Sequence, residues 1–325
     1  MLDTDTPRAG ASPAARIPNP PVKRKGQGNM ARRNLRNGLL FASPWIVGFV
    51  CFTLYPLVAS MYYSLCAFSG LNHPVFIGLE NYRQIISDEL FTKSLGNTMY
   101  MVIVGLPLSL IAALALAMLL NQKVRGISVY RTIYYLPSLV PAVASAILWM
   151  WLLNPEIGLI NRLLAPAFAA FHSAPPAWLG DPHWAKPALV MMGVWGAGGS
   201  VIIYLAGLQD VPTSLYEAAD LDGATAWAKF RNVTVPMISP IIFFNLIMGI
   251  IGTFQYFTQA FVMTQGGPQD ATMFYALRLF NSAFIDWKMG YASAMAWILF
   301  AITLVCTIVV MKTSGRWVYY GGGDE

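Results

Sequence analysis

Six long apolar runs alternate with polar segments along the 325-residue chain. They cover residues 39–65, 94–120, 132–153, 188–208, 237–263 and 291–311. A helix that rises about 1.5 Å per residue needs roughly 20 residues to cross about 30 Å of hydrocarbon, and each run reaches that length. Lipid offers no hydrogen-bond partners to a peptide backbone, so these runs should be helices. The pattern predicts an all-α integral membrane protein with six transmembrane helices, in a domain over residues 33–320.

Composition and charge support a membrane location and set the expected topology. Hydrophobic residues make up 56% of the chain and charged residues 11%, whereas a soluble domain has about a quarter charged. Fifteen of the 21 Lys and Arg residues fall on one side of the six predicted spans, which is the cytoplasmic side by the positive-inside rule. Both termini are therefore expected in the cytoplasm. The net charge of +6 reflects this topology, so we expect membrane lipid and no nucleic acid as a partner.

Residues 1–32 precede the first span and are predicted to be a disordered, basic cytoplasmic tail. This segment is rich in proline and poor in aliphatic side chains, which is typical of disorder.

The apolar runs contain no charged residue and no histidine. The three cysteines, Cys51, Cys66 and Cys306, lack the spacing of a metal site. We therefore expect no metal, no catalytic residue and no enzyme activity in this chain. The alternative function is an ion-coupled secondary transporter of a small polar solute, and a membrane-embedded enzyme is a further one. Both normally need ionisable side chains within the membrane.

The predicted cytoplasmic loop between the fourth and fifth spans is acidic, with a net charge of −2, which suits a protein partner better than anionic lipid. Ser214 and Glu217 match a capping box, which predicts a helix over 215–221. Gly223 permits a left-handed turn that would end this helix. A second helix would start near Ala224 and end before Pro236.

Ten positions of this loop, at fixed offsets, resemble the EAA signature of permease subunits of bacterial binding-protein-dependent ABC importers. They are Glu217, Ala218, Ala219, Asp222, Gly223, Ala224, Phe230, Val233, Pro236 and Pro240. Isoleucine is commoner than valine at position 233. Weaker matches at 78–82, 97–98, 158–161, 264–268 and 290–294 resemble the carbohydrate branch, the maltose and glycerol-phosphate type permeases.

The resemblance implies a type I ABC importer permease in the bacterial inner (cytoplasmic) membrane, a multi-pass chain. It also implies an assembly with a second permease subunit in a hetero-dimer, two ATPase subunits and a soluble solute-binding protein. Residues 210–240 would form the loop that couples to an ATPase, through Glu217, Ala218, Ala219, Asp222, Gly223, Ala224, Phe230 and Pro236. Glu217 would cap its own helix, pair with a basic residue of the ATPase, or do both. The sequence has no GxxxxGK[ST] phosphate loop, so no cofactor is expected in this chain, and ATP and magnesium belong to the ATPase.

Polar side chains on the fifth span are candidates for a solute pathway. Asn245, Gly249, Gly252, Tyr256 and Gln259 recur at steps of three or four residues, which places them on one stripe of a continuous helix. Amide and phenol groups can hydrogen-bond the hydroxyls of a sugar, oligosaccharide or polyol. Further candidates are Gln255, beside the stripe, and Gly199 and Ser200 in the fourth span. The alternative is that the stripe is a packing seam. The absence of a buried Lys or Arg favours a neutral solute.

The predicted outer loop over residues 154–187 contains an apolar stretch at 159–170. Its aromatic residues suit the headgroup level of the membrane. A helix along the outer face, available to a soluble partner, is the other interpretation.

Overall fold

The computed structural model describes residues 27–122, 124–170 and 172–319. The chain divides into two compact units, residues 1–57 and 58–325. The described part of the first unit contains α1 (Gln27–Phe49), a π-helical turn (Val50–Leu54) and the start of α2 (Tyr55–Ser64). Residues 1–26 of the predicted tail lie outside the described residues. The prediction of disorder is wrong for residues 27–32, because α1 already begins at Gln27.

The second unit is helical apart from one short hairpin of β1 (Cys66–Ala67) and β2 (Val75–Phe76). Its helices are α3 (Glu80–Ser87), α4 (Glu89–Tyr100), α5 (Leu106–Leu120), α6 (Ile127–Tyr135), α7 (Ala142–Leu152), α8 (Leu159–Ala170), α9 (Pro182–Trp195), α10 (Gly198–Asp210), α11 (Thr213–Leu221), α12 (Ala226–Lys229), α13 (Val235–Phe254), α14 (Thr258–Met263), α15 (Tyr275–Phe280) and α16 (Met289–Ser314). Further π-helical turns cover Met101–Gly105, Phe230–Thr234 and Asn281–Ile285, and Leu136–Leu139 is a 3₁₀ turn.

Four helical segments are long and apolar enough to cross a membrane: Arg32–Ser64, Glu89–Leu120, Ala226–Met263 and Met289–Ser314. Two bent pairs raise the number to six if each pair is one span. They are Ile127–Leu139 with Ala142–Leu152, bent by 100°, and Pro182–Trp195 with Gly198–Asp210, bent by 45°. The predicted span 132–153 is therefore not one continuous helix. Val140 is extended because proline at position 141 disfavours the helical conformation of the residue before it.

Three proline residues inside the long spans follow widened helical turns. Pro56, Pro107 and Pro236 each lie two residues after a π-helical turn. A proline ring has no N–H to donate and would collide with the carbonyl of residue i−4 in a regular α-helix. The wider turn opens the backbone at this point, so these spans continue through their prolines.

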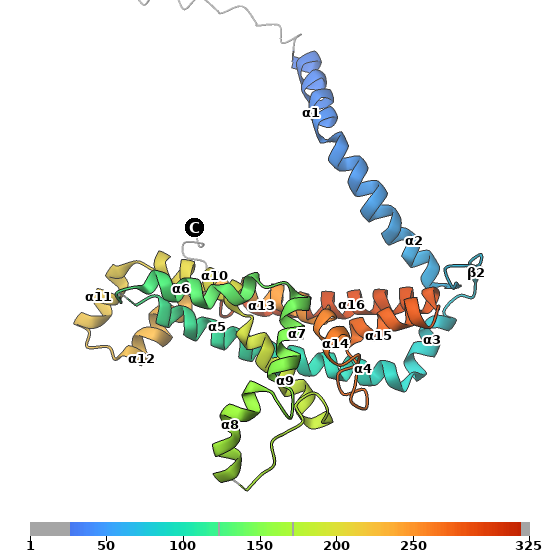
Figure 1. Ribbon diagram of the computed structural model, residues 1–325. Coiled ribbons are helices and arrows are strands. Elements are labelled where there is room, and N and C mark those ends of the chain that lie inside the picture. The colour runs from blue at the N-terminus through green and yellow to red at the C-terminus, as the bar shows by residue number, and fades with distance from the viewer. Residues whose placement is uncertain (1–26, 123, 171, 320–325) are drawn as a thin grey trace, which may run out of the picture. The chain divides into compact units, whose positions relative to one another are not determined.

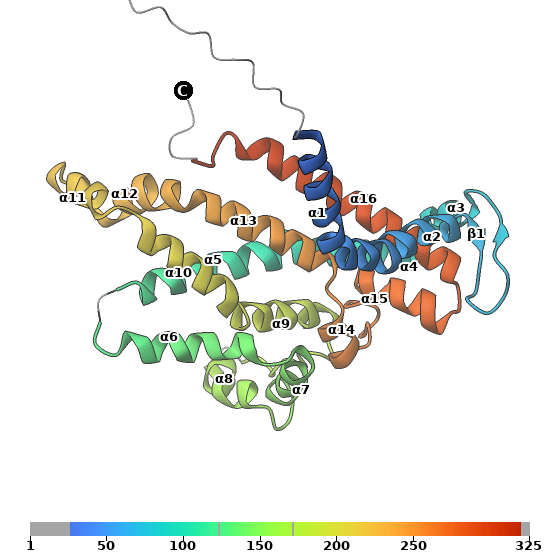
Figure 2. The same cartoon turned by 90° about the horizontal axis from the view of Figure 1, so that it is seen from above.

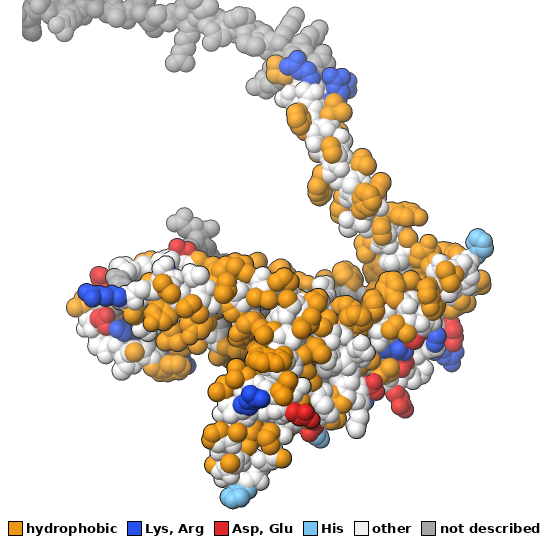
Figure 3. Space-filling view, viewed as in Figure 1, with side chains coloured by type: hydrophobic (Ala, Val, Ile, Leu, Met, Phe, Trp, Pro, Cys, Tyr) orange, Lys and Arg blue, Asp and Glu red, His pale blue; other side chains and the backbone are white. Residues whose placement is uncertain are grey.

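Four clusters of buried hydrophobic residues lie in the second unit, and two of them contain most of these residues. One joins α5, α10 and α13 around Tyr204 and Ile238, and the other joins α7, α9 and α14 around Trp149 and Leu189. Helices α11 and α12 lie at one end of this unit and α3 with the hairpin at the other, in both ribbon views (Figures 1 and 2). Hydrophobic side chains cover the surface between these ends, where lipid or other subunits would contact it (Figure 3).

Gly290 at the start of α16 provides a test of this packing. Its N–H donates to the Phe68 carbonyl at 2.9 Å, and a Cβ built on it would collide with the Cys66 carbonyl oxygen. Backbone atoms cannot rotate away, so Gly290→Ala should lower the free energy of unfolding by about 1–3 kcal/mol. Thermal unfolding of the detergent-solubilised protein measures this. Gly96→Ala is the control, because a Cβ there meets no heavy atom within 4 Å. Equal melting temperatures for the two variants would contradict the packing described here.

Candidate functional site

The predicted coupling loop begins with α11, but the capping box does not form. The helix starts at Thr213, directly after Pro212, and no side chain caps its N-terminus. Ser214 is thus already inside the first turn, two positions after the N-cap residue Pro212. The capping role predicted for Glu217 is therefore wrong.

The end of α11 confirms the turn predicted at Gly223, whose φ of +73° lies in the left-handed region. The Gly223 N–H donates to the Asp220 carbonyl at 3.1 Å, and the Ala224 N–H donates to the Ala219 carbonyl at 2.9 Å. These two bonds are a Schellman motif. Lys229 and Asp220 form an ion pair at 2.7 Å that joins the two short helices of the loop.

The second helix of the loop does not end before Pro236, in contrast to the prediction. α12, the turn Phe230–Thr234 and α13 run on from one another, within a helical segment that covers Ala226–Met263. The loop is thus connected without interruption to the fifth span.

Several side chains of this loop are exposed to solvent. Glu217 is exposed and makes no hydrogen bond or ion pair with any described residue. Leu221 is 90% exposed and Trp227 is 67% exposed. Leu221 and Trp227 are not among the coupling residues that the sequence predicts. The available signal was large apolar side chains inside a short polar loop, which is typical of an interaction surface.

Three broken spans meet at one cavity of about 240 Å³. Pro137, Ser138, Val140, Ala142 and Ser145 come from the break in the third span, Met192, Gly193, Trp195 and Gly196 from the break in the fourth, and Tyr256 and Gln259 from the fifth. None of these lining residues is charged. Helix breaks in a membrane occur where protein or water can satisfy the freed backbone groups, so this cavity is the candidate solute site.

The predicted stripe on the fifth span is divided, because α13 ends at Phe254 and α14 begins at Thr258. Tyr256 and Gln259 line the cavity described above. Asn245, Gly199 and Ser200 line a second cavity of about 480 Å³, and Gly193 lines both.

The other two pathway candidates are not brought to these cavities. Gln255 lines a third, largely apolar cavity against α16, away from Tyr256. Gly252 lines neither of the two cavities that share Gly193.

Lys186 is a partly buried basic residue just before the predicted fourth span. It lies two residues before the predicted fourth span, but α9 begins at Pro182, so Lys186 lies within a helix and is half-buried. Its Nζ donates to Asn97 Oδ1 at 3.0 Å and lies 5.2 Å from the centroid of the Tyr100 ring. Lys186 lines neither solute cavity. Within the described part of the chain, no group of three His, Cys, Asp or Glu residues could hold a metal ion.

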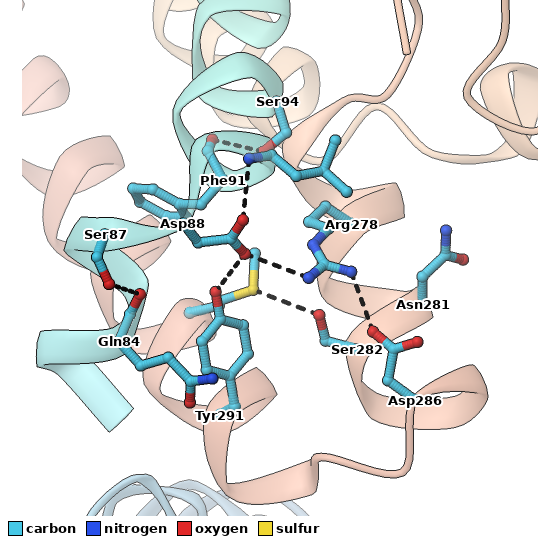
Figure 4. Close-up of polar contacts among 12 residues, drawn as sticks. Gln84, Ser87, Asp88, Phe91, Ser94, Arg278, Asn281, Ser282, Asp286 and Tyr291 are labelled. Carbon is cyan, nitrogen blue, oxygen red and sulfur yellow. Dashed lines mark hydrogen bonds and ion pairs between the residues drawn. The ribbon is translucent and has the colours of Figure 1, made fainter. Parts of the chain in front are cut away.

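A polar cluster joins α4, α15 and α16 at the opposite end of the unit from α11 (Figures 1 and 4). Arg278 donates to Asp88 at 3.2 Å and to Asp286 at 3.0 Å, and the Tyr291 hydroxyl donates to Asp88 at 2.7 Å. Burial alone would raise the pKa of Asp88. The hydrogen bonds from Tyr291, Arg278 and the Leu90 amide outweigh burial and hold the pKa of this carboxyl below its usual range. The cluster thus connects α15 to the starts of α4 and α16, the helices that begin two of the spans.

The sequence of this chain is similar to those of known permease proteins. The probable ABC transporter permease protein YesP of Bacillus subtilis (strain 168) is 40% identical over 298 residues, which cover 90% of this chain and 95% of YesP. The lactose transport system permease protein LacF of Rhizobium radiobacter is 33% identical and covers 84% of this chain, which covers 92% of LacF. The trehalose/maltose transport system permease protein MalF of Thermococcus litoralis is 32% identical, with 86% and 94% covered.

The fold also resembles a solved structure, a chain of a bacterial ABC transporter involved in the import of the acidic polysaccharide alginate. The TM-score is 0.72 at 23% identity, with 89% of this chain and 99% of that chain covered. Residues 95–318 match the family model described as binding-protein-dependent transport system inner membrane component, and the chain belongs to this family.

The chain is therefore the permease component of an ABC importer, a multi-pass protein of the inner membrane and a transport component rather than the catalytic one. This family membership sets aside the ion-coupled secondary transporter. Systems of this kind work with an ATPase and a periplasmic binding protein.

The ion pair of Asp88 predicts a pH-dependent stability. A lowered pKa in the folded state means that Asp88 stabilises the fold fully above its ordinary value of 3.8 and loses this effect as the pH falls below that value. Asp88→Asn should thus cost on the order of 1 kcal/mol at neutral pH, since the Asp88 side chain is 21% exposed, and progressively less as the pH falls below 3.8. Thermal unfolding between neutral pH and a pH well below 3.8 measures the difference. Glu89→Gln, at the neighbouring exposed residue, serves as the control. A cost of Asp88→Asn that stays constant with pH would rule out the ionic contribution.

Proposed function

We propose that this permease conducts a neutral carbohydrate (a sugar, oligosaccharide or polyol) through the cavity where three broken spans meet. The observation that carries this proposal is the uncharged polar lining of that cavity. Ser138, Ser145, Gln259 and the Tyr256 hydroxyl offer both donors and acceptors, which sugar hydroxyls require. The aromatic rings of Tyr256 and Trp195 suit the apolar face of a sugar. The names of LacF and MalF, which refer to lactose and trehalose/maltose, support a carbohydrate class.

The path continues from this cavity into the second one. Both cavities include Gly193, and the second adds Gly199, Ser200 and Asn245. The Asn245 amide donates one N–H to the Ile241 carbonyl at 3.0 Å, so its second N–H and its oxygen are the groups left for a solute. Together the cavities follow the fourth and fifth spans along the direction that a solute would travel.

Coupling to ATP hydrolysis would pass through the loop over residues 210–240. The contact surface would combine the predicted residues Glu217, Ala218, Ala219, Asp222, Gly223, Ala224, Phe230 and Pro236 with the exposed Leu221 and Trp227. Because the Asp220–Lys229 ion pair joins the two short helices and α12 runs on into α13, a push on the loop would move α13. Tyr256 lies just beyond the end of α13, so this motion would reach the cavity.

The complete transporter would contain this chain, a second and different permease subunit, two ATPase subunits that bind ATP and magnesium, and one solute-binding protein. The coupling loop and both termini would lie in the cytoplasm. The support for this orientation is the distribution of basic residues, 15 of 21 on the side of the coupling loop.

Cysteine labelling tests the solute pathway. Tyr256→Cys and Gln259→Cys should react with a small thiol reagent, and a transported sugar should slow that reaction several-fold by occupying the cavity. Gln255→Cys is the matched control, because Gln255 lies next to Tyr256 in sequence but lines a different cavity. The native cysteines are first replaced by serine. Equal protection at all three positions, or no protection at positions 256 and 259, would disprove the assignment.

Glu217→Gln tests the coupling surface. Removing this charge should weaken binding of the ATPase roughly tenfold, or about 1.4 kcal/mol, by analogy with charge pairs in other interfaces. The melting temperature of the permease should not change, because Glu217 has no partner within the described chain. Asp220→Asn is the contrasting variant, since it removes the ion pair with Lys229 and should affect the loop itself. Normal ATP-driven uptake by Glu217→Gln would refute the role of this residue.

A further inference from the structure

A polar pocket of about 340 Å³ lies between α3 and the start of α16, beside the Arg278 cluster. Its lining residues are Gln84, Ser87, Asp88, Arg278, Lys288 and Tyr291 (Figure 4 shows all but Lys288). They come from three segments that are far apart in sequence. The pocket lies outside both solute cavities and far along the chain from the coupling loop.

The carboxylate of this pocket is already engaged as an acceptor, whereas several donors are not. The Asp88 carboxylate accepts hydrogen bonds from the Leu90 amide at 2.9 Å, from Tyr291 at 2.7 Å and from Arg278 at 3.2 Å. Arg278 Nε is buried without a partner among the described residues. The Lys288 ammonium and the Gln84 side-chain amide also lack a partner in the described chain. Arg278 Nε is the buried member of this set, whereas Lys288 and Gln84 are exposed and free to bind. These donors suit the pocket to a ligand rich in acceptors, such as a phosphate group.

The length of α16 places this pocket at the level of the lipid headgroups. α16 has 26 residues and is therefore about 39 Å long, close to the roughly 40–45 Å thickness of a bilayer including its headgroups. Lys288 directly precedes this helix and so lies near one headgroup layer.

Exposed apolar side chains surround the pocket at this level. Phe284, Ile285 and Trp287 precede Lys288 and are each more than half exposed, and Ile86 on α3 is exposed as well. Tryptophan at the end of a span is typical of the membrane–water interface. A soluble partner would leave these side chains in water whenever it dissociated, whereas a membrane covers them permanently.

We propose that this pocket binds the phosphate group of a membrane phospholipid. The Lys288 ammonium and the Gln84 amide hold the phosphate above the guanidinium of Arg278, and the acyl chains lie over Phe284 and Ile285. The charges of Asp88, Arg278, Asp286 and Lys288 sum to zero, so the site accepts a zwitterionic headgroup as well as an anionic one. The lipid thereby stabilises the junction between α3, α15 and α16.

Native mass spectrometry of the full-length chain, purified in its complex, tests this proposal. After partial delipidation, phosphatidylethanolamine is added back and the bound lipids are counted. The double variant Lys288→Gln/Gln84→Ala should bind one phospholipid fewer than the wild type. Lys288→Arg, which keeps the positive charge, should bind as many as the wild type. Lys93→Gln is the matched control and should lose none, because Lys93 is an exposed lysine that already donates to the Gln269 carbonyl and pairs with Asp270.

Three outcomes would overturn the proposal. The first is an unchanged lipid count in the double variant. The second is that inorganic phosphate removes the difference in lipid count between the wild type and the double variant, which would indicate a site for free phosphate. The third is a loss of affinity for the solute-binding protein with no loss of lipid, which indicates that the pocket takes a carboxylate of that protein. A melting temperature close to that of the wild type shows that the double variant is folded, as expected for two exposed side chains.

Discussion

The hydrogen bonding of the backbone within the membrane is the constraint on which this structure depends. Hydrocarbon cannot hydrogen-bond an unpaired N–H or carbonyl, so a membrane helix can break only where protein or a water-filled cavity satisfies the freed groups. This chain breaks its third, fourth and fifth spans, and all three breaks line one cavity. Where the chain has no such cavity, it retains the helix through a proline by widening one turn, as at Pro107 and Pro236.

The same constraint connects the cavity to the coupling loop. The turn over Phe230–Thr234 allows the helix to pass Pro236, so the loop and the fifth span form one continuous element that ends beside Tyr256. A second loop helix that ended before Pro236 would instead have left a non-helical connection between the loop and the fifth span. The Schellman motif at Gly223 and the Asp220–Lys229 ion pair make the loop itself compact. Together these features would let the loop act as the lever that we propose between an exposed surface and an internal cavity.

Patterns local in sequence were predictable, and contacts between distant segments were not. Apolar length identified the six runs, the stretch 159–170 is the helix α8, and the left-handed turn at Gly223 followed from its residue type. The helical stripe from Asn245 to Gln259 assumed a continuous helix, so the break after Phe254 invalidated the placement of Gln255. The pairing of Asp88 with Arg278 joins residues 190 positions apart, for which no periodicity gives a signal. The start of α9, six residues before the apolar run, was likewise not visible in the apolar pattern.

The central claim is that movement of the coupling loop changes the shape of the cavity at the broken spans. Distances between spin labels at Ser145 and Gln259, which line this cavity from α7 and α14, test it most directly. In the assembled transporter the distance distribution should shift when ATP binds, and the shift should disappear in a Gly223→Val background, where the loop is misdirected. A distribution that is the same with and without nucleotide would contradict the account.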